Sequence, residues 1–381
     1  MNIIKPFPRL PTNFGSFLKS KAIMFLLVPM IFFGSLAHAG IPVEEIRGFI
    51  SKEALFPPSP ALLAALGTAH LEVDLRAIDP YAKYIPPSSL SNKAPLSVHL
   101  GIEVFPYKSM LWIRPDTGGP ADQAGMPEIG TLRAINGKKI STVDLAKVSV
   151  QLDKAIRKSS VNLTISNLSS QKEVVYLIRP SVLQPLSITW RRMGTDLMVQ
   201  IRDFVAHDTA PKLYALYKTV VRTAGTRVIF DLRGCSGGDL YEAIEIAGMF
   251  VAADLPLAST YNREGIVRTY RAPPGQKLHS PIWVLMDRRT ASSAEILAGI
   301  LQHYHLTRLV GEPSFGKFVS QTIFPLPNGG NFWLTTLAIR LPDDVSRNGN
   351  GIKPDILYPD ISITRVSDII RRISEGNYGA H

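Results

Sequence analysis

The second half of the chain alternates between short apolar runs and helical segments, and this alternation constrains the fold more than any other feature. Three runs have the length and composition of buried strands: Arg227–Leu232, Ile282–Met286 and Leu306–Val310. Helical patterns follow the first two, over Leu240–Val251 and from about Ser292 to His303. A strand–helix–strand succession produces parallel strands joined by right-handed crossovers. We therefore predict an α/β core over residues 181–381.

The loops that follow these strands carry the groups that could form a site. The first loop is the turn Arg233-Gly234-Cys235-Ser236-Gly237-Gly238, the second leads into Ser292, and the third contains Lys317. The carboxyl ends of parallel strands meet at one edge of a sheet, where ligands bind. If the last two strands are neighbours, about 4.8 Å separates them. Ser292 and Lys317 could then meet.

A serine and a lysine at one sheet edge are compatible with acyl transfer. A serine hydroxyl becomes a nucleophile only when a base takes its proton, and none of the eight histidines lies in an evident catalytic motif. A lysine can serve as that base when burial lowers its pKa. Phe315 and Phe318 offer such burial to Lys317. The backbone N–H after the serine and one in the glycine turn would stabilise the oxyanion.

Each of these features also has a structural interpretation. Ser292 begins the sequence Ser-Ser-Ala-Glu, which is typical of a helix capping box, and the local sequence alone favours that cap. A lone lysine in a loop is usually solvated. A glycine-rich turn can hold a phosphate, but this turn lacks both Gly-x-Gly-x-x-Gly and the Walker lysine. The spacing is thus compatible with a serine–lysine site without establishing one.

Two further regions precede the α/β core. Residues 40–95 are rich in Ala and Leu at helical spacing and predict a helical N-terminal segment. Residues 96–180 predict a compact β-rich module, because strand-like runs alternate there with turn signals. The elements expected in this module are the strands Val98–Phe105, Met110–Ile113, Gly130–Ile135 and Val161–Ile165, the helix Asp144–Arg157, and a hairpin turn at Asn136-Gly137.

Residues 1–39 are typical of a secretory leader. They contain four basic residues and no acidic one, then a short apolar run and the small-x-small site Ala37-His38-Ala39. The apolar run, residues 22–36, is shorter than the roughly 20 residues that span a bilayer, and an uncleaved anchor is the alternative. We therefore expect export to the periplasm of a Gram-negative bacterium, with no transmembrane span after cleavage.

The composition disfavours several classes of protein. The chain carries 42 Lys and Arg against 31 Asp and Glu, a formal charge of +11. Outside the leader the basic residues are scattered in pairs, which disfavours a nucleic-acid partner. Cys235 is the single cysteine, so neither a disulfide framework nor a cysteine-based zinc cluster can form. We expect no cofactor and no metal.

Six short motifs follow one another through the chain after the leader. The first three are Asp79-Pro80-Tyr81-Ala82-Lys83-Tyr84-Ile85-Pro86-Pro87, Gly119-Pro120-Ala121-Asp122-Gln123-Ala124-Gly125 with Ile135-Asn136-Gly137, and Asp231-Leu232-Arg233-Gly234 with Gly237-Gly238. The last three are Thr290-Ala291-Ser292-Ser293-Ala294-Glu295-Ile296, Gly311-Glu312-Pro313-Ser314-Phe315-Gly316-Lys317 and Gly349-Asn350-Gly351-Ile352-Lys353-Pro354-Asp355. In this order they resemble the motifs of the carboxyl-terminal processing peptidases, also called tail-specific proteases.

This resemblance implies a serine endopeptidase with a crotonase-like core and an inserted PDZ domain. The residues that match the family's site are Ser292 as nucleophile, Lys317 as general base, Gln321 as the group that orients the lysine amine, and the N–H groups of Ser293 and of Gly237 or Gly238 as the oxyanion hole. In the PDZ domain, Leu100-Gly101-Ile102 resembles the loop that binds a terminal carboxylate. An ordinary strand with a glycine for tight packing is the alternative.

The sequence departs from the family pattern at four places. These are Phe318 in place of a glycine, His303 in place of an aspartate, Cys235-Ser236 in place of Asn-Pro, and Ser293-Ala294 in reversed order. None of them removes a predicted catalytic group. Two functions therefore stay open: a periplasmic endopeptidase that engages protein tails, with an adaptor protein or a second copy as further partner, and a catalytically weak PDZ scaffold that binds peptides.

Overall fold

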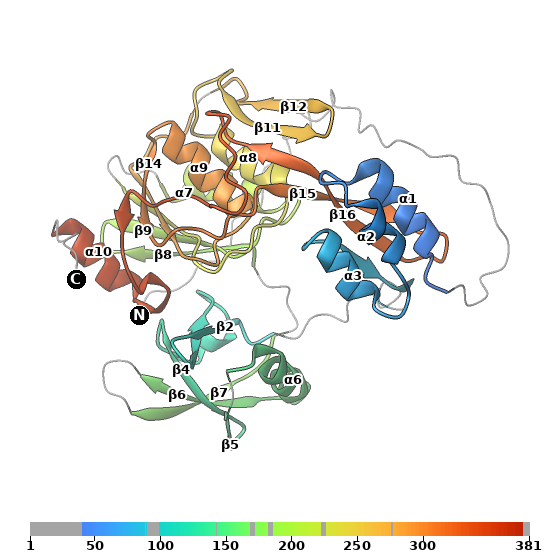
Figure 1. Ribbon diagram of the computed structural model, residues 1–381. Coiled ribbons are helices and arrows are strands. Elements are labelled where there is room, and N and C mark those ends of the chain that lie inside the picture. The colour runs from blue at the N-terminus through green and yellow to red at the C-terminus, as the bar shows by residue number, and fades with distance from the viewer. Residues whose placement is uncertain are drawn as a thin grey trace.

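The computed structural model of the chain describes residues 40–375, apart from residues 88, 90–98, 142, 168–171, 182–185, 222–225 and 276. The predicted leader, residues 1–39, lies outside the described residues. Three β-sheets organise the described chain (Figure 1), and a hydrophobic core lies against each of them. None of the described helices is both long and apolar enough to cross a membrane.

The first sheet contains the three strands predicted for the α/β core. In spatial order its strands are β17 (Ile356–Leu357), β14 (Thr307–Gly311), β13 (Ile282–Met286), β10 (Val228–Asp231), β9 (Asp196–Ile201) and β8 (Ile188–Met193). β10, β13 and β14 are adjacent and parallel, with Val228 opposite Ile282 and Ile282 opposite Thr307. The predicted parallel arrangement is therefore confirmed, and the last two predicted strands are neighbours.

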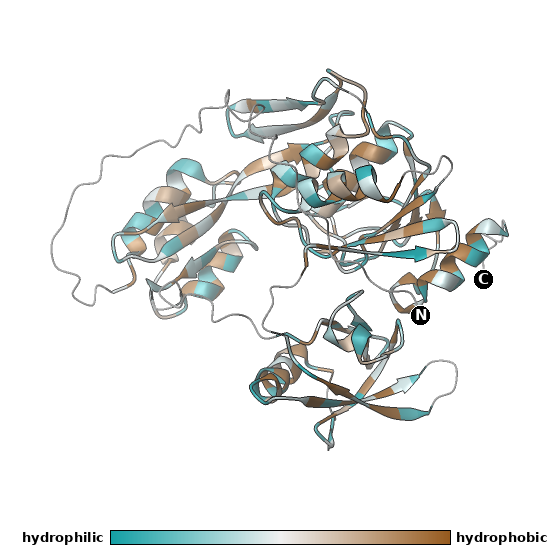
Figure 2. Cartoon of the chain, turned by 180° about the vertical axis from the view of Figure 1, so that it is seen from behind, coloured by the Kyte–Doolittle hydropathy of each residue, from teal (hydrophilic) through white to brown (hydrophobic). Residues whose placement is uncertain are grey.

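Helices cover both faces of this sheet because alternate strand residues point to opposite sides. The helices α7 (Thr209–Thr219), α8 (Leu240–Gly248) and α9 (Ser293–His303) share a core with Phe230 and Val284. The C-terminal helix α10 (Val366–Ser374) packs against Ile229 and Leu285 on the other face. In Figure 2, hydrophobic residues concentrate on the strands and on the helix faces that meet them.

A second sheet joins the N-terminal segment to the C-terminal half of the core. Its strands are β1 (Lys83–Ile85), β16 (Asn331–Arg340), β11 (Pro256–Asn262) and β12 (Gly265–Arg271), and β15 (Val319–Pro325) also pairs with β16. The N-terminal helices α1 (Val43–Glu53), α2 (Pro60–Ala65) and α3 (Leu71–Ile78) lie beside β15 and β16 (Figure 1). Ile50 and Leu75 share a core with Phe332 of β16, so the N-terminal segment is anchored on this sheet.

The third sheet forms the β-rich module. Its strands are β2 (Ile102–Tyr107), β3 (Met110–Pro115), β4 (Gly130–Ile135), β6 (Val161–Asn167) and β7 (Glu173–Ile178), with β5 (Lys138–Lys139) paired to β4. The module also contains α5 (Pro120–Gln123) and α6 (Leu145–Ile156), and it has a separate hydrophobic core. β2 pairs with β3 alone among the described strands, so its other edge is open.

The boundaries in the module differ from the prediction at its start. The first strand begins at Ile102, because Gly101 adopts a left-handed backbone with φ 64° that interrupts extended structure; Val98 of the predicted strand lies outside the described residues. β5, β7 and the short helix α5 were not predicted. The predicted hairpin turn is confirmed. Asn136 and Gly137 have φ 49° and 76°, the pair of positive φ angles that a two-residue hairpin requires.

Candidate active site

Ser292 lies immediately before helix α9, in the loop that follows β13. Its backbone has φ 55° and ψ −122°, a conformation that costs a residue with a side chain about 1–3 kcal/mol. The Ala291 N–H donates to the carbonyl oxygen of Cys235 at 2.9 Å, which ties this loop to the glycine turn after β10. A sharp, strained strand-to-helix turn is a known way to present a serine hydroxyl at a sheet edge. The Ser292 side chain is half-buried.

The glycine turn adjoins Ser292 so closely that side chains are excluded from it. A Cβ on Gly237 would lie 2.7 Å from the Cβ of Ser292 and 2.9 Å from the backbone nitrogen of Ser293. A Cβ on Gly238 would lie 2.4 Å from the carbonyl oxygen of Phe204. The two glycines and the Ser293 backbone therefore meet beside Ser292.

The backbone N–H groups of this region differ in what they bind. The N–H groups of Ser293 and Gly238 donate no hydrogen bond to any described residue. The Gly237 N–H, in contrast, lies near the Cys235 thiol and lowers its pKa. Burial raises the pKa of the Cys235 thiol to about 12, so the thiol stays protonated and is not a nucleophile.

The hydroxyl of Ser293 is turned toward the glycine turn. It donates to the carbonyl oxygen of Gly238 at 2.8 Å, and Ser293 is only 1% exposed. Ser292 and Ser293 are thus distinguished by their surroundings. The buried Ser293 has a structural partner for its hydroxyl, whereas the half-buried Ser292 adjoins Gly237.

Glu295 joins the loop of Ser292 to the loop of Lys317. Its fully buried carboxylate accepts, through Oε2, the N–H of Ser292 at 2.8 Å and the N–H of Lys317 at 2.8 Å. Its Oε1 accepts the N–H of Gly316 at 2.7 Å and the hydroxyl of Ser314. The carboxylate half of the predicted capping box is therefore present. The second role of the same carboxylate, in holding the lysine loop, was not predicted.

Lys317 is half-buried, and its amine lies over an aromatic ring. Nζ is 4.7 Å from the ring centroid of Tyr81. Burial lowers the pKa of Lys317 below its ordinary value; Asp79 and Glu295 act against this shift, and Lys83 adds to it. Among the hydrogen bonds of the described residues, none joins Lys317 to Ser292.

Two groups predicted to act on Lys317 lie differently from the prediction. The side-chain amide of Gln321 donates to Thr335 Oγ1 at 3.1 Å, and it makes no hydrogen bond to Lys317 in the described part of the chain. Phe318 is 1% exposed, but Phe315 is 55% exposed and does not supply the predicted burial. The Phe315 N–H donates to the carbonyl oxygen of Thr290, so its backbone ties the lysine loop to the serine loop.

Leu100-Gly101-Ile102 lies at the start of the open edge strand β2. Gly101 packs against α5: a Cβ there would lie 2.7 Å from Pro120 Cδ, which supports the tight-packing interpretation. The carbonyl oxygen of Leu100 accepts the Ala121 N–H at 3.0 Å. The N–H groups of Leu100 and Gly101 donate to no described residue, which is compatible with the carboxylate interpretation. Tight packing of Gly101 and binding of a terminal carboxylate are both compatible with this geometry.

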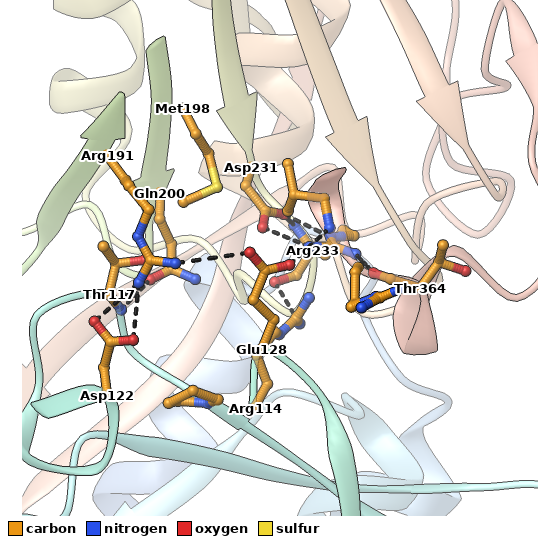
Figure 3. A pocket seen from close by; sticks show the side chains of 13 residues that line it. Arg114, Thr117, Asp122, Glu128, Arg191, Met198, Gln200, Asp231, Arg233 and Thr364 are labelled. Atoms are coloured by element: carbon orange, nitrogen blue, oxygen red, sulfur yellow. Dashed lines mark hydrogen bonds and ion pairs between the residues drawn. The ribbon is translucent and has the colours of Figure 1, made fainter. Parts of the chain in front are cut away.

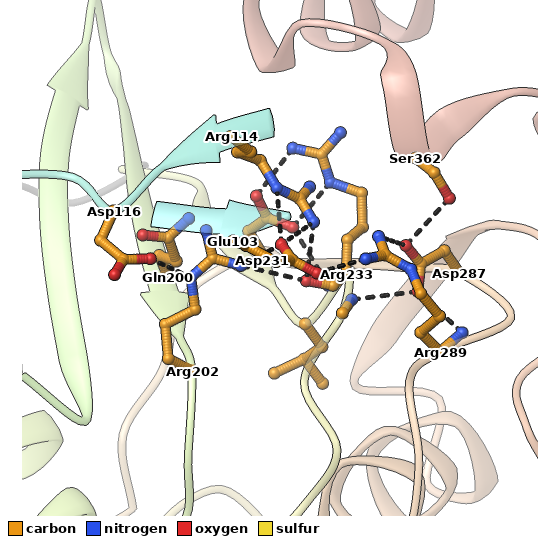
Figure 4. Close-up of polar contacts among 12 residues, drawn as sticks. Glu103, Arg114, Asp116, Gln200, Arg202, Asp231, Arg233, Asp287, Arg289 and Ser362 are labelled. Carbon is orange, nitrogen blue, oxygen red and sulfur yellow. Dashed lines mark hydrogen bonds and ion pairs between the residues drawn. The ribbon is translucent and has the colours of Figure 1, made fainter. Parts of the chain in front are cut away.

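Glu103 of β2 holds the β-rich module against the core (Figure 4). Its carboxylate accepts from Arg114 of the module at 2.7 Å, from Arg202 of the core at 2.9 Å, and from Arg289 of the serine loop. Burial by itself raises the pKa of Glu103, but the three guanidinium groups outweigh it and lower the pKa to about 2. Arg289 also pairs with Asp287 at 2.7 Å. This network connects β2 to the loop that carries Ser292, and nothing in the sequence pattern indicated it.

A small polar pocket lies next to this network (Figure 3). Its lining includes Arg114, Asp122, Arg191, Gln200, Asp231 and Arg233, and neither Ser292 nor Lys317 contributes to it. Arg191 pairs with Asp122 at 2.8 Å and Arg233 with Asp231 at 2.7 Å, so its charges largely satisfy one another. The pocket therefore belongs to the contact between module and core. Across the described residues no group of three or more His, Cys, Asp or Glu side chains could hold a metal ion.

Replacing Glu103 by glutamine is expected to destabilise the protein by about 3 kcal/mol, because it leaves buried guanidinium groups without a counter-charge. The folded-state pKa of about 2 lies below the ordinary value of 4.5. The carboxylate therefore stabilises the fold fully above pH 4.5, and this contribution is lost as the pH falls toward 2. Urea unfolding of both proteins at about pH 6 and pH 3 measures this. A stability difference that does not shrink on acidification would contradict the assignment.

Residues 197–358 match the model of peptidase family S41. A carboxyl-terminal-processing protease of Picosynechococcus is 30% identical over 292 residues, which cover 74% of this chain and 70% of that protein. The chain belongs to peptidase family S41. The family membership predicted from the six motifs is thereby confirmed, and the chain is a serine-type peptidase.

Two further similarities agree with this membership. A carboxyl-terminal-processing protease of Synechocystis is 27% identical over 278 residues, which cover 71% of this chain and 64% of that protein. The solved structure of a photosystem II D1 C-terminal processing protease gives a TM-score of 0.56 at 20% identity, over 88% of this chain and 95% of that one. The structural likeness establishes a shared fold of mixed α/β content.

Proposed function

We propose that this chain is a periplasmic endopeptidase in which Ser292 is the nucleophile and Lys317 the general base. The observation that carries the proposal is the buried Glu295 carboxylate, whose Oε2 accepts the N–H groups of both residues at 2.8 Å. One carboxylate thus fixes the backbone of both residues at the carboxyl ends of two adjacent parallel strands, where ligands bind.

The reaction needs only groups of this chain and water. Neutral Lys317 Nζ accepts the proton of Ser292 Oγ while Oγ bonds to the carbonyl carbon of the scissile peptide, whose oxygen becomes an oxyanion. The ammonium then returns the proton to the amide nitrogen, the C–N bond breaks, and an acyl-enzyme remains. Water, deprotonated by Lys317, attacks the ester, and Oγ leaves with the proton. Burial favours the neutral amine at the start of this cycle, because it lowers the pKa of Lys317.

The oxyanion would be stabilised by the N–H groups of Ser293 and Gly238. Both lack a hydrogen-bond acceptor among the described residues, whereas the Gly237 N–H lies near the Cys235 thiol. Of the two glycines predicted for this role, we therefore assign it to Gly238. Donors held in place before the reaction cost no reorganisation when the charge develops.

The β-rich module would act as a PDZ domain that binds the tail of a protein substrate. Its strand β2 has an open edge to which an extended peptide can add as a further strand. The N–H groups of Leu100 and Gly101, which donate to no described residue, lie at the start of this edge, where a terminal carboxylate would bind. Tail binding on this module would hold the rest of the substrate near a crotonase-like protease core.

Labelling with a fluorophosphonate probe tests the proposed site. We expect the purified mature protein to be phosphonylated on Ser292, because only an activated serine reacts rapidly with this electrophile. The adduct is located by mass spectrometry, and turnover is measured with fluorescently labelled casein. A protein that binds tail peptides but shows neither labelling nor turnover would be the scaffold and would overturn the proposal.

A further inference from the structure

Tyr81 reaches Lys317 from a distant part of the sequence, and we propose that it is a positioning residue for the lysine amine. The proposal rests on the proposed function, in which Lys317 is the general base. Tyr81 belongs to the turn between α3 and β1 in the N-terminal segment. The face of its ring lies against Nζ, with 4.7 Å between the nitrogen and the ring centroid.

A buried carboxylate holds Tyr81 in this place. Asp79, 8% exposed, accepts the Tyr81 N–H through Oδ1 at 2.9 Å. It also binds β16, accepting the N–H of Thr335 at 2.8 Å and its hydroxyl at 3.1 Å. Gln321 of β15 donates to the same hydroxyl at 3.1 Å. The backbone of Tyr81 is thus tied, through Asp79, to β16, which pairs with β15, the strand that follows Lys317.

This chain of contacts gives Gln321 an indirect role. Three hydrogen bonds, through Thr335 and Asp79, connect its amide to the backbone of Tyr81, whose ring contacts the amine. The resemblance to the family implied that Gln321 orients the lysine amine. Here the group against the amine is the Tyr81 ring, and Gln321 supports the carboxylate that holds it.

The ring limits the positions that the flexible lysine side chain can adopt and keeps water from one side of Nζ. Two effects on the charge of the amine oppose each other: an aromatic face attracts an ammonium, and exclusion of water favours the neutral amine. Burial is the largest influence on the pKa of Lys317, with Asp79 and Glu295 opposing it and Lys83 reinforcing it. The ring covers one side of the amine and so contributes to this burial.

The hydroxyl of Tyr81 has no part in this role. Burial raises the pKa of Tyr81, and Glu295 and Asp79 raise it further, so the phenol stays uncharged at neutral pH. Phenylalanine presents the same face and should replace tyrosine. Alanine removes the face and admits water.

The test compares Tyr81→Phe, Tyr81→Ala and Tyr81→Leu with Val73→Ala, an exposed position of the same segment, as control. The readout is the rate constant for phosphonylation of Ser292 as a function of pH, with casein turnover alongside. We expect Tyr81→Phe to stay within about twofold of the wild-type rate. Tyr81→Ala should react about tenfold more slowly at the plateau, because the base is misplaced but still present, whereas removing a general base costs about 10²–10⁴. The rate of Tyr81→Ala should also rise only at higher pH, because water around the amine raises the pKa of Lys317.

Tyr81→Leu keeps the apolar volume, so it serves if the alanine variant does not fold. It should lose the plateau rate by a similar factor, since a flat face no longer aligns Nζ, without the shift to higher pH. Wild-type rates and a wild-type pH profile in both Tyr81→Ala and Tyr81→Leu would overturn the role of Tyr81. A loss of plateau rate in Tyr81→Phe equal to that in Tyr81→Ala would overturn it too. A loss accompanied by a lower Tm and an unmoved pH profile in Tyr81→Ala would mean a purely structural role. The proposed function is tested separately: it falls if the wild type is neither labelled nor active, or if Lys317→Ala is phosphonylated at the wild-type rate.

Discussion

Lys317→Ala is expected to abolish proteolysis while leaving the fold intact. The substitution removes the proposed base, and loss of a general base typically costs a factor of about 10²–10⁴ in rate. The fold should survive because the side chain is half-buried and belongs to none of the hydrophobic cores. The backbone N–H that donates to Glu295 is also present in alanine. Casein turnover and thermal unfolding of the variant measure the two parts of this expectation.

The pH dependence of the wild type is the companion measurement. Lys317 accepts a proton only when neutral, so kcat/KM should rise with pH through an apparent pKa below the about 10.4 of a free lysine, as burial of this amine requires. Lys52→Ala, an exposed lysine of α1, is the matched control and should retain the wild-type rate and profile. Near-normal turnover in Lys317→Ala would eliminate the serine–lysine dyad.

The α/β core could be predicted from the sequence because short stretches of residues specify its strands and helices. The run Ile282–Met286 is the strand β13 to the residue, and Arg227–Leu232 differs from β10 by one residue at each end. Buried parallel strands read as short apolar runs, and the handedness rule for crossovers then leaves few topologies. The same local signals place the loops of Ser292 and Lys317 at one edge of the sheet.

The contacts that assemble the site could not be predicted in this way. Glu103 meets Arg202 and Arg289 across the boundary between module and core, and Tyr81 meets Lys317 across most of the chain. Such pairs follow from how whole elements pack, and no periodicity or spacing encodes them. The motif Asp79-Pro80-Tyr81 could have indicated the second of these contacts, because it matched the family and no site role was assigned to its residues. Phe315 shows the opposite error: an apolar residue beside the lysine was expected to bury it but is itself exposed.

The two adjacent serines should respond very differently to the same substitution. Ser292→Ala removes the only oxygen that could form the acyl-enzyme, so turnover and phosphonylation should both be lost while tail binding on the module continues. Ser293→Ala keeps the backbone N–H proposed for the oxyanion hole and removes a hydroxyl that donates to Gly238 at 2.8 Å. Loss of one such hydrogen bond costs about 1 kcal/mol, so activity should stay within about tenfold of the wild type, or ~1.4 kcal/mol of barrier.

The geometry explains why only one of the pair can be the nucleophile. The hydroxyl of the buried Ser293 already donates to Gly238 in the glycine turn, whereas Ser292 is half-buried. Both variants are assayed on labelled casein, and the phosphonate adduct of the wild type is mapped by mass spectrometry. An adduct on Ser293, or an inactive Ser293→Ala beside an active Ser292→Ala, would move the nucleophile one residue along the chain. The strained φ of 55° at Ser292 would then be a feature of the helix cap rather than of catalysis.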